Sequence, residues 1–271
     1  MATWDFPGSD PIDLRVTCAS GSVKITAEPT DVTTVVATRS ARGDASDAID
    51  DVIVSFVDGR LEVTEPDRRG LRWHSHDLYV TIVMPAGSAA SIRTASADIT
   101  CRGEYGAVNI RSASGAVDVQ NVTGTADITT MSGSVQLLSA ADCEVQTASG
   151  RVSVRHAGGD LAAKTASGSI TIGTADRSVT VRTASGQVRI GSVHRGQTDV
   201  SGVSGDVDVK VVQGTGVYQD LASVTGRVTS DLDSADDGSG AEMPGEDLSL
   251  RCRTVSGSIS VGRAPAGQMA G

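Results

Sequence analysis

Two histidines at alternate positions are the side chains of this sequence best placed for chemistry. His74 and His76 stand beside Asp77 and follow three arginines between residues 68 and 72. Alternate residues of a strand share a face, so two imidazoles and a carboxylate there could hold a metal or, with the arginines, an anion. No third metal ligand is identifiable, and a polar hairpin loop explains the segment equally well. We therefore assign no metal, cofactor or catalytic residue.

Acidic residues offer a second chemistry. A hydrolase or lyase built on stacked β-coils needs carboxylates, or a lysine or arginine, gathered on neighbouring coils. Asp118, Asp206 and Asp208 are expected to face outward from strands, but they do not fall in adjacent repeats. No G-x-S-x-G or H-E-x-x-H motif occurs. The sequence thus predicts a protein that is not an enzyme.

Hydroxyl residues recur more regularly than any other polar type. One column comprises Ser96, Ser114, Ser132, Ser149, Ser167, Ser185, Ser204, Thr225 and Ser256. A second comprises Thr94, Ser112, Thr130, Thr147, Thr165, Thr183, Ser223 and Thr254. A flat hydroxyl array of this kind occurs in ice-binding solenoids, whereas stacked corners use hydroxyls to satisfy local backbone groups. Because the columns adjoin a corner glycine, the sequence favours the structural role.

These columns belong to an eight-residue phrase that recurs at a nearly fixed interval. Its copies are TASADITC (94–101), SASGAVDV (112–119), TMSGSVQL (130–137), TASGRVSV (147–154), TASGSITI (165–172), TASGQVRI (183–190), GVSGDVDV (202–209), SVTGRVTS (223–230) and TVSGSISV (254–261), with CASGSVKI (18–25) standing apart. From Ala97 to Gly257 the intervals are 18, 18, 17, 18, 18, 19, 21 and 31 residues. A period of this length is the signature of a solenoid.

Each period holds two short alternating runs, as in Val179-x-Val181 and Val188-x-Ile190. Alternation of β-branched residues predicts strands. Val181 and Val188 are an odd number of residues apart, so both reach one core only if the chain turns a corner at the T-A-S-G segment 183–186. No room remains for a helix, so successive copies should stack directly in parallel. We predict an all-β, right-handed parallel β-solenoid of about 18 residues per coil.

The ends of the chain differ from this repeat. Residues 1–92 hold most of the aromatic residues and are predicted to form a β-rich cap with a hairpin at Asp58-Gly59. The solenoid is assigned to 93–263, with an acidic loop insertion at 231–247, and 264–271 is assigned as a flexible tail. Ala97 stands where later copies have glycine, so the first corner should be strained or bend differently.

Composition narrows the environment and the partners. The net charge of −10 argues against nucleic acid and against an anionic membrane. Cys101, Cys143 and Cys252 fall at apolar positions of strands, which indicates buried free thiols in a reducing compartment. No secretory signal and no apolar run of about 18 residues is present, so we expect a cytoplasmic protein.

The phrase T-A-S-G-x-V-x-V resembles the repeat of the bacterial DUF4097 β-strand-repeat family, often labelled "putative adhesin". Trp4-Asp5-Phe6 and the segment VMPAGSAASIRTASADI (83–99) are most similar to a cytoplasmic actinobacterial branch. The resemblance covers essentially the whole chain. It implies a β-solenoid of uncharacterised function and carries no catalytic residues.

The sequence therefore favours a structural or protein-interaction scaffold without a cofactor. An adhesin-like or polysaccharide-binding protein is the alternative, and a solenoid enzyme is a distant third. After the last phrase only ten residues remain, too small to cover a coil. We thus expect the final coil to expose Ile259 and Val261 and to mediate self-association, as a dimer through the C-terminal coils, or binding of a protein partner.

Overall fold

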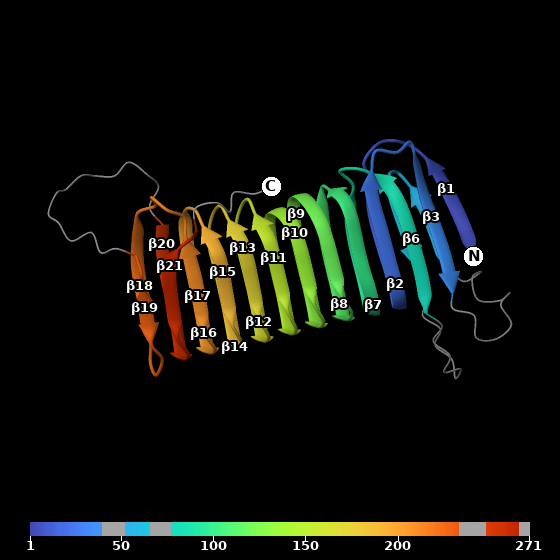
Figure 1. Ribbon diagram of the computed structural model, residues 1–271. Helices are drawn as coiled ribbons and strands as arrows, with labels where there is room; N and C mark the ends of the chain where they lie inside the picture. Colours follow the sequence, from blue (N-terminus) through green and yellow to red (C-terminus); the bar gives the residue numbers. More distant parts are fainter. Residues whose placement is uncertain (40–51, 66–76, 233–247, 266–271) are drawn as a thin grey trace, which may run out of the picture. The chain divides into compact units, whose positions relative to one another are not determined.

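In the part of the chain that the structure describes, all regular secondary structure is β-strand (Figure 1). The computed structural model describes residues 1–39, 52–65, 77–232 and 248–265. His74, His76 and most of the acidic insertion 231–247 lie outside these residues, as does most of the tail assigned to 264–271. Two compact units, Met1–Ala140 and Ala141–Gly271, are described separately below.

Unit 1 is a stack of parallel coils closed at its N-terminal end by antiparallel strands. Its strands are β1 (Ala2–Pro7), β2 (Asp13–Glu28), β3 (Val32–Arg39), β4 (Ile53–Val57), β5 (Arg60–Thr64), β6 (Leu78–Pro85), β7 (Ala89–Tyr105), β8 (Ala107–Ser114), β9 (Val117–Ser132) and the first part of β10 (Val135–Ser149). The first half of β7 pairs with β8 and its second half with β9, both in parallel. β8 pairs in parallel with the second half of β9.

The isolated copy CASGSVKI belongs to this stack. β2 pairs in parallel with β7, which aligns Cys18 with Thr94 and Gly21 with Ala97. On its other side β2 pairs in parallel with β5 and then with β6. The copy is therefore a complete coil, covered on both sides, although 76 residues separate Cys18 from its partner Thr94.

Antiparallel pairing begins one layer further out. β4 and β5 form the hairpin predicted at Asp58-Gly59, where both residues have positive φ (49° and 74°). β3 pairs antiparallel with β6, and β1 with β3. The rings of Phe6 in β1 and Phe56 in β4 lie 5.2 Å apart and join the two outer strands.

Unit 2 repeats one coil with little variation. It continues β10 and adds β11 (Val152–Ala157), β12 (Leu161–Ser167), β13 (Ile170–Ala175), β14 (Val179–Ser185), β15 (Val188–Val193), β16 (Gly196–Ser204), β17 (Val207–Val211), β18 (Val217–Ser223), β19 (Val228–Ser230), β20 (Leu248–Ser256) and β21 (Ile259–Arg263). β10, β12, β14 and β16 form one parallel ladder, and β11, β13, β15 and β17 form another. The predicted parallel β-solenoid is confirmed.

Branched apolar side chains from both ladders fill the core. Val181 and Val188 have no exposed surface although they stand on opposite sides of a corner. The turn at Gly186, with φ 141°, points both side chains inward. Outward positions between them carry the polar residues, which gives each strand its alternating burial.

The order of coils at the C-terminal end differs from the prediction. β20 lies between β16 and β18, and β21 lies between β17 and β19. Ile259 and Val261 are therefore buried, and the prediction that the last copy in the sequence ends the stack is wrong. The copies differ in polarity: apart from Thr254 at the corner, β20 and β21 point apolar residues inward, whereas β18 and β19 also point Gln219 and Ser230 inward, where Ser230 donates a hydrogen bond to Gln219 (2.8 Å). Burying the more apolar copy avoids desolvating that polar pair.

Ala97 marks a corner that bends differently. The glycines of the later corners from Gly115 to Gly257, except Gly226, have φ between 116° and 146°, whereas Ala97 has no positive φ and lies within the continuous strand β7. Of the two outcomes expected for this corner, strain or a different bend, the structure shows the different bend. Alanine is therefore accommodated there without backbone strain.

We predict that Gly168→Ala lowers the free energy of unfolding by more than about 1 kcal/mol. The residue has φ 146°, and a Cβ there would overlap the carbonyl oxygen of Gly150. Gly202→Ala is the matched control, since its Cβ would lie 3.5 Å from Thr183 Cγ2, an ordinary contact, at a φ suited to alanine. Urea unfolding of the two variants measures the difference; equal stabilities would show that the corner does not need glycine.

Candidate functional site

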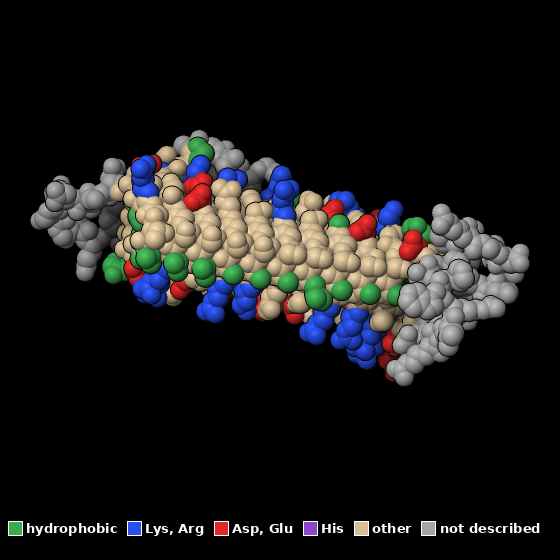
Figure 2. Space-filling model, turned by 90° about the horizontal axis from the view of Figure 1, so that it is seen from below, with side chains coloured by type: hydrophobic (Ala, Val, Ile, Leu, Met, Phe, Trp, Pro, Cys, Tyr) green, Lys and Arg blue, Asp and Glu red, His purple; other side chains and the backbone are tan. Residues whose placement is uncertain are grey.

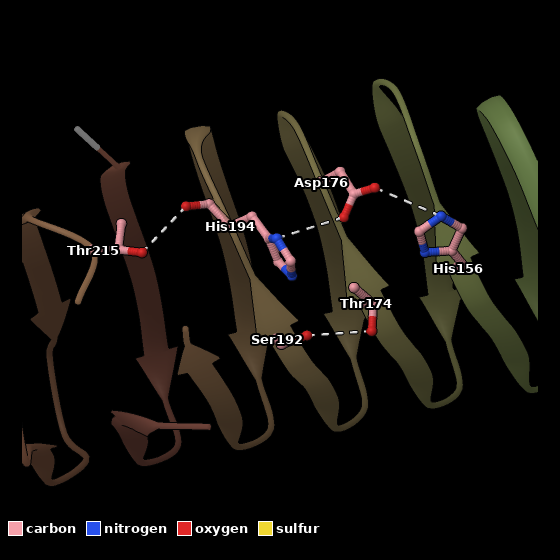
Figure 3. A network of polar contacts seen from close by, with 6 residues as sticks. All are labelled: His156, Thr174, Asp176, Ser192, His194 and Thr215. Atoms are coloured by element: carbon pink, nitrogen blue, oxygen red, sulfur yellow. Dashed lines mark hydrogen bonds and ion pairs between the residues drawn. The ribbon is translucent and has the colours of Figure 1, made fainter. Parts of the chain in front are cut away.

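Two histidines and an aspartate form a polar network across three consecutive coils of unit 2 (Figure 3). His156 lies near the end of β11, Asp176 directly follows β13, and His194 directly follows β15. Asp176 Oδ2 lies 3.6 Å from His156 Nε2, and Asp176 Oδ1 lies 3.8 Å from His194 Nδ1. The three side chains are 34–44% exposed. Solvent-facing turns therefore carry this network.

Hydrogen bonds along the same edge hold its backbone in place. Ser192 Oγ donates to Thr174 Oγ1 (3.2 Å), linking two outward hydroxyls of neighbouring coils. Thr215 Oγ1 donates a long hydrogen bond to the carbonyl oxygen of His194 (3.5 Å). The network thus extends over the turns that follow β13, β15 and β17.

The geometry favours electrostatic linkage over metal binding. The imidazoles approach different oxygens of Asp176 from opposite sides, so the three groups do not converge on one point (Figure 3). Across the described ranges, no cluster of three or more His, Cys, Asp or Glu is suited to hold a metal. The carboxylate can instead attract either imidazole when that ring is protonated.

The sequence contained a signal for this network that we did not use. Asp176 and His194 are 18 residues apart, which is the coil period and places them at the same position of adjacent coils. His156 precedes Asp176 by 20 residues and so reaches it from the coil before.

The other predicted polar residues have structural partners. Asp118 pairs with Arg102 (2.9 Å), Asp208 approaches Arg189 (3.9 Å), and Asp206 accepts the backbone N–H of Ser258 (2.8 Å). Asp77 is described, but its neighbours His74 and His76 are not.

Most residues of the second hydroxyl column, which begins at Thr94, hydrogen-bond to the backbone as expected. Ser112, Thr130, Thr147 and Thr254 each donate to the carbonyl two residues ahead, at 2.8–3.4 Å. Thr165 and Thr183 are exceptions, because their buried hydroxyls have no hydrogen-bond partner. The serines of the other column are mostly exposed beside the corner.

In each unit the stacked corners form a surface, here called the corner face (Figure 2). Between the two hydroxyl columns runs an exposed apolar column: Ala95, Ala113 and Met131 in unit 1, and Ala148, Ala166, Ala184, Val203, Val255 and Val224 in unit 2. Cationic side chains stand two residues earlier in several coils, namely Arg93, Arg111, Lys164, Arg182 and Arg253. Figure 2 shows the row of hydrophobic side chains with Lys and Arg side chains beyond one margin.

A hollow interrupts this face in unit 2. Gly202 replaces the threonine found at the aligned positions Thr183 and Thr254. Lys164, Arg182, Ala184 and Val203 line the resulting depression, of about 310 Å³. The side chain of Lys164 also pairs with Glu144 (3.0 Å).

All four thiols are free and buried. Burial raises the pKa of Cys18, Cys101, Cys143 and Cys252 to about 12. The three thiols expected in the core are there, and Cys18 joins them. None of these groups is a thiolate at neutral pH, so none is poised for nucleophilic chemistry.

Fold and site together define a class: a parallel β-solenoid scaffold of uncharacterised role. The chain belongs to the DUF4097 family, whose model, described as "Toastrack DUF4097", matches residues 6–174 and 139–269.

Solved structures give more distant likenesses. A "putative adhesin" from Parabacteroides distasonis is 14% identical over 96% of each chain with a TM-score of 0.40. A "putative lipid binding protein" from the same species is 11% identical over 96% of each chain, with a TM-score of 0.38. A "putative adhesin" from Bacteroides fragilis is 14% identical over 96% of each, with a TM-score of 0.36. Among curated proteins none matches. Within the described residues no helix is long and apolar enough to cross a membrane.

We predict that none of the four thiols reacts quickly with a thiol reagent at about pH 8, because each pKa is near 12 and each side chain is buried. All four should react once denaturant unfolds the chain. Mass spectrometry of the labelled protein counts them, and rapid labelling of any cysteine in the folded protein would contradict its assigned burial.

Proposed function

We propose that the protein is a non-catalytic interaction scaffold whose binding surface is the corner face. The observation that carries the proposal is the exposed apolar column beside cationic side chains, repeated coil after coil. Val203, Val255 and Val224 are 56%, 49% and 76% exposed. Isolated exposed apolar residues are ordinary, whereas an aligned series of them is typical of contact surfaces.

Electrostatics indicate the kind of partner. Arg182 and Arg253 stand exposed beside the apolar column, so an extended protein segment carrying acidic and small apolar side chains would complement it. The absence of aromatic residues from the described corner face makes a polysaccharide a poorer fit, since sugar rings stack on aromatic side chains. A cytoplasmic location is part of this proposal.

The non-catalytic assignment rests on the polar groups. Asp118, Asp206 and Asp208 each have a structural partner, and the thiols are protonated and buried. His156, Asp176 and His194 lie on an exposed edge, where water is not excluded. No group in the described chain combines a nucleophile or base with a closed pocket.

We predict that Ala166→Glu with Ala184→Glu abolishes the protein–protein cross-links that the wild-type chain forms in native cells. Both side chains are exposed on adjacent coils, so the new charges repel an acidic partner without entering the core. Ser153→Glu with Thr171→Glu is the matched control, also on adjacent coils, but on the outward side of β11 and β13. Identical cross-link patterns for both double variants would place the binding surface elsewhere.

A further inference from the structure

The outermost coil of unit 2 has one uncovered side. Within the described residues, β18 pairs with β20 and β19 pairs with β21, and neither strand has a second partner (Figure 1). Val217 and Leu221 point inward but are only partly buried, whereas the aligned Leu248 and Cys252 are fully buried. The coil therefore ends in two unpaired strand edges with a half-covered core between them.

This edge lacks the features that usually protect exposed strands. Proteins blunt such edges with lysine, proline, bulges or inward-pointing charges. β18 contains one charged residue, Asp220, whose outward carboxylate pairs with Arg251 (3.2 Å) and Arg253 (2.9 Å). β19 contains no charge. Tyr218, Val224 and Val228 are 69%, 76% and 40% exposed, so apolar surface accompanies the open backbone.

We propose that two copies of the chain join through this coil as a two-fold dimer, with β18 antiparallel to β18 and β19 antiparallel to β19 of the second copy. This inference is independent of the corner face. A single extended segment could pair with only one of the two edges and would leave the core open. A second copy brings two edges and the complementary apolar surface together.

The positions of the two strands allow both pairings at once. Asp220 and Thr229 are equally far from the corner between Val224 and Thr225, so one two-fold axis can pass through both. About that axis Tyr218 lies opposite Ala222 of the second copy, and Arg227 lies opposite its Asp231. Each Asp220 meets its equivalent, but the four arginines at positions 251 and 253 of the two copies outnumber the two carboxylates.

Antiparallel closure has a precedent within the chain. At the end of unit 1, parallel stacking stops where β3 pairs antiparallel with β6. Inward polar groups do not oppose the contact, because Gln219 and Ser230 already bond each other. The two-fold contact pairs the open strand edges of both copies, so no third copy can add through it and the assembly is a dimer.

The first test compares sedimentation of the wild-type chain with that of Val228→Lys. We expect a wild-type dimer at about 50 µM and at least a tenfold weaker association for the variant, because its ammonium group would be buried in the interface. The remaining coils should keep their circular dichroism, since each depends mainly on its neighbours. A strict wild-type monomer, filaments, or a dimer that Val228→Lys leaves unchanged would each overturn the proposal.

A second test does not depend on how that variant folds. Thr229→Cys places a thiol on the proposed axis, so mild oxidation should link two chains covalently. Ser260→Cys is the matched control, because Ser260 is exposed and aligned with Thr229 on the strand one layer inside. The native thiols are buried and should not interfere. Equal cross-linking of both variants, or none of Thr229→Cys, would overturn the proposed contact.

Discussion

The hydrogen bonds between successive corners are the constraint on which the rest of unit 2 depends. The N–H groups of Gly168, Gly186 and Gly205 each donate to the carbonyl oxygen of the corner serine in the neighbouring coil, at 2.9 Å. On its other side each of these glycines lies so close to the corner glycine of the preceding coil that a Cβ would overlap that glycine's carbonyl oxygen. Glycine is therefore required for close approach as well as for its positive φ.

The position of the corner also determines which side chains of each coil point into the core. Because every corner is aligned with its neighbours, valine and isoleucine fall into inward columns and the polar residues into outward ones. The core contains almost no aromatic residue in unit 2, and the stack compensates with branched side chains that contact their counterparts a strand spacing away. Chemistry-bearing groups are consequently displaced to turns and outward positions, where water reaches them.

Local physics explains why much of the fold could be predicted from the sequence. The interval between Val181 and Val188 requires a corner, the 18-residue period requires stacking, and Asp58-Gly59 requires a hairpin. The order in which the coils stack at the ends could not be predicted from these local rules. It depends on which copy gains most by burial on both sides, and comparing the inward residues of β18 with those of β20 would have been needed to predict it. The His156–Asp176–His194 network was visible as a coil-length spacing, but its distances depend on the turns that carry it.

Burial rather than chain order decides which coil is outermost at the C-terminal end. The last coil in the sequence, β20 with β21, lies beneath β18 and β19. A coil frays readily when only one neighbour holds it, because stability in a solenoid is a sum over adjacent pairs. Placing β20 and β21 one layer inside gives them two neighbours and moves the exposed position to a segment tethered at both ends. At the N-terminal end the coil of β2 likewise has neighbours on both sides, but the first strand of the chain, β1, is itself an outer strand that pairs with β3. Chain order and burial therefore diverge at the C-terminal end, where the coil of β18 and β19 sets the surface available for association.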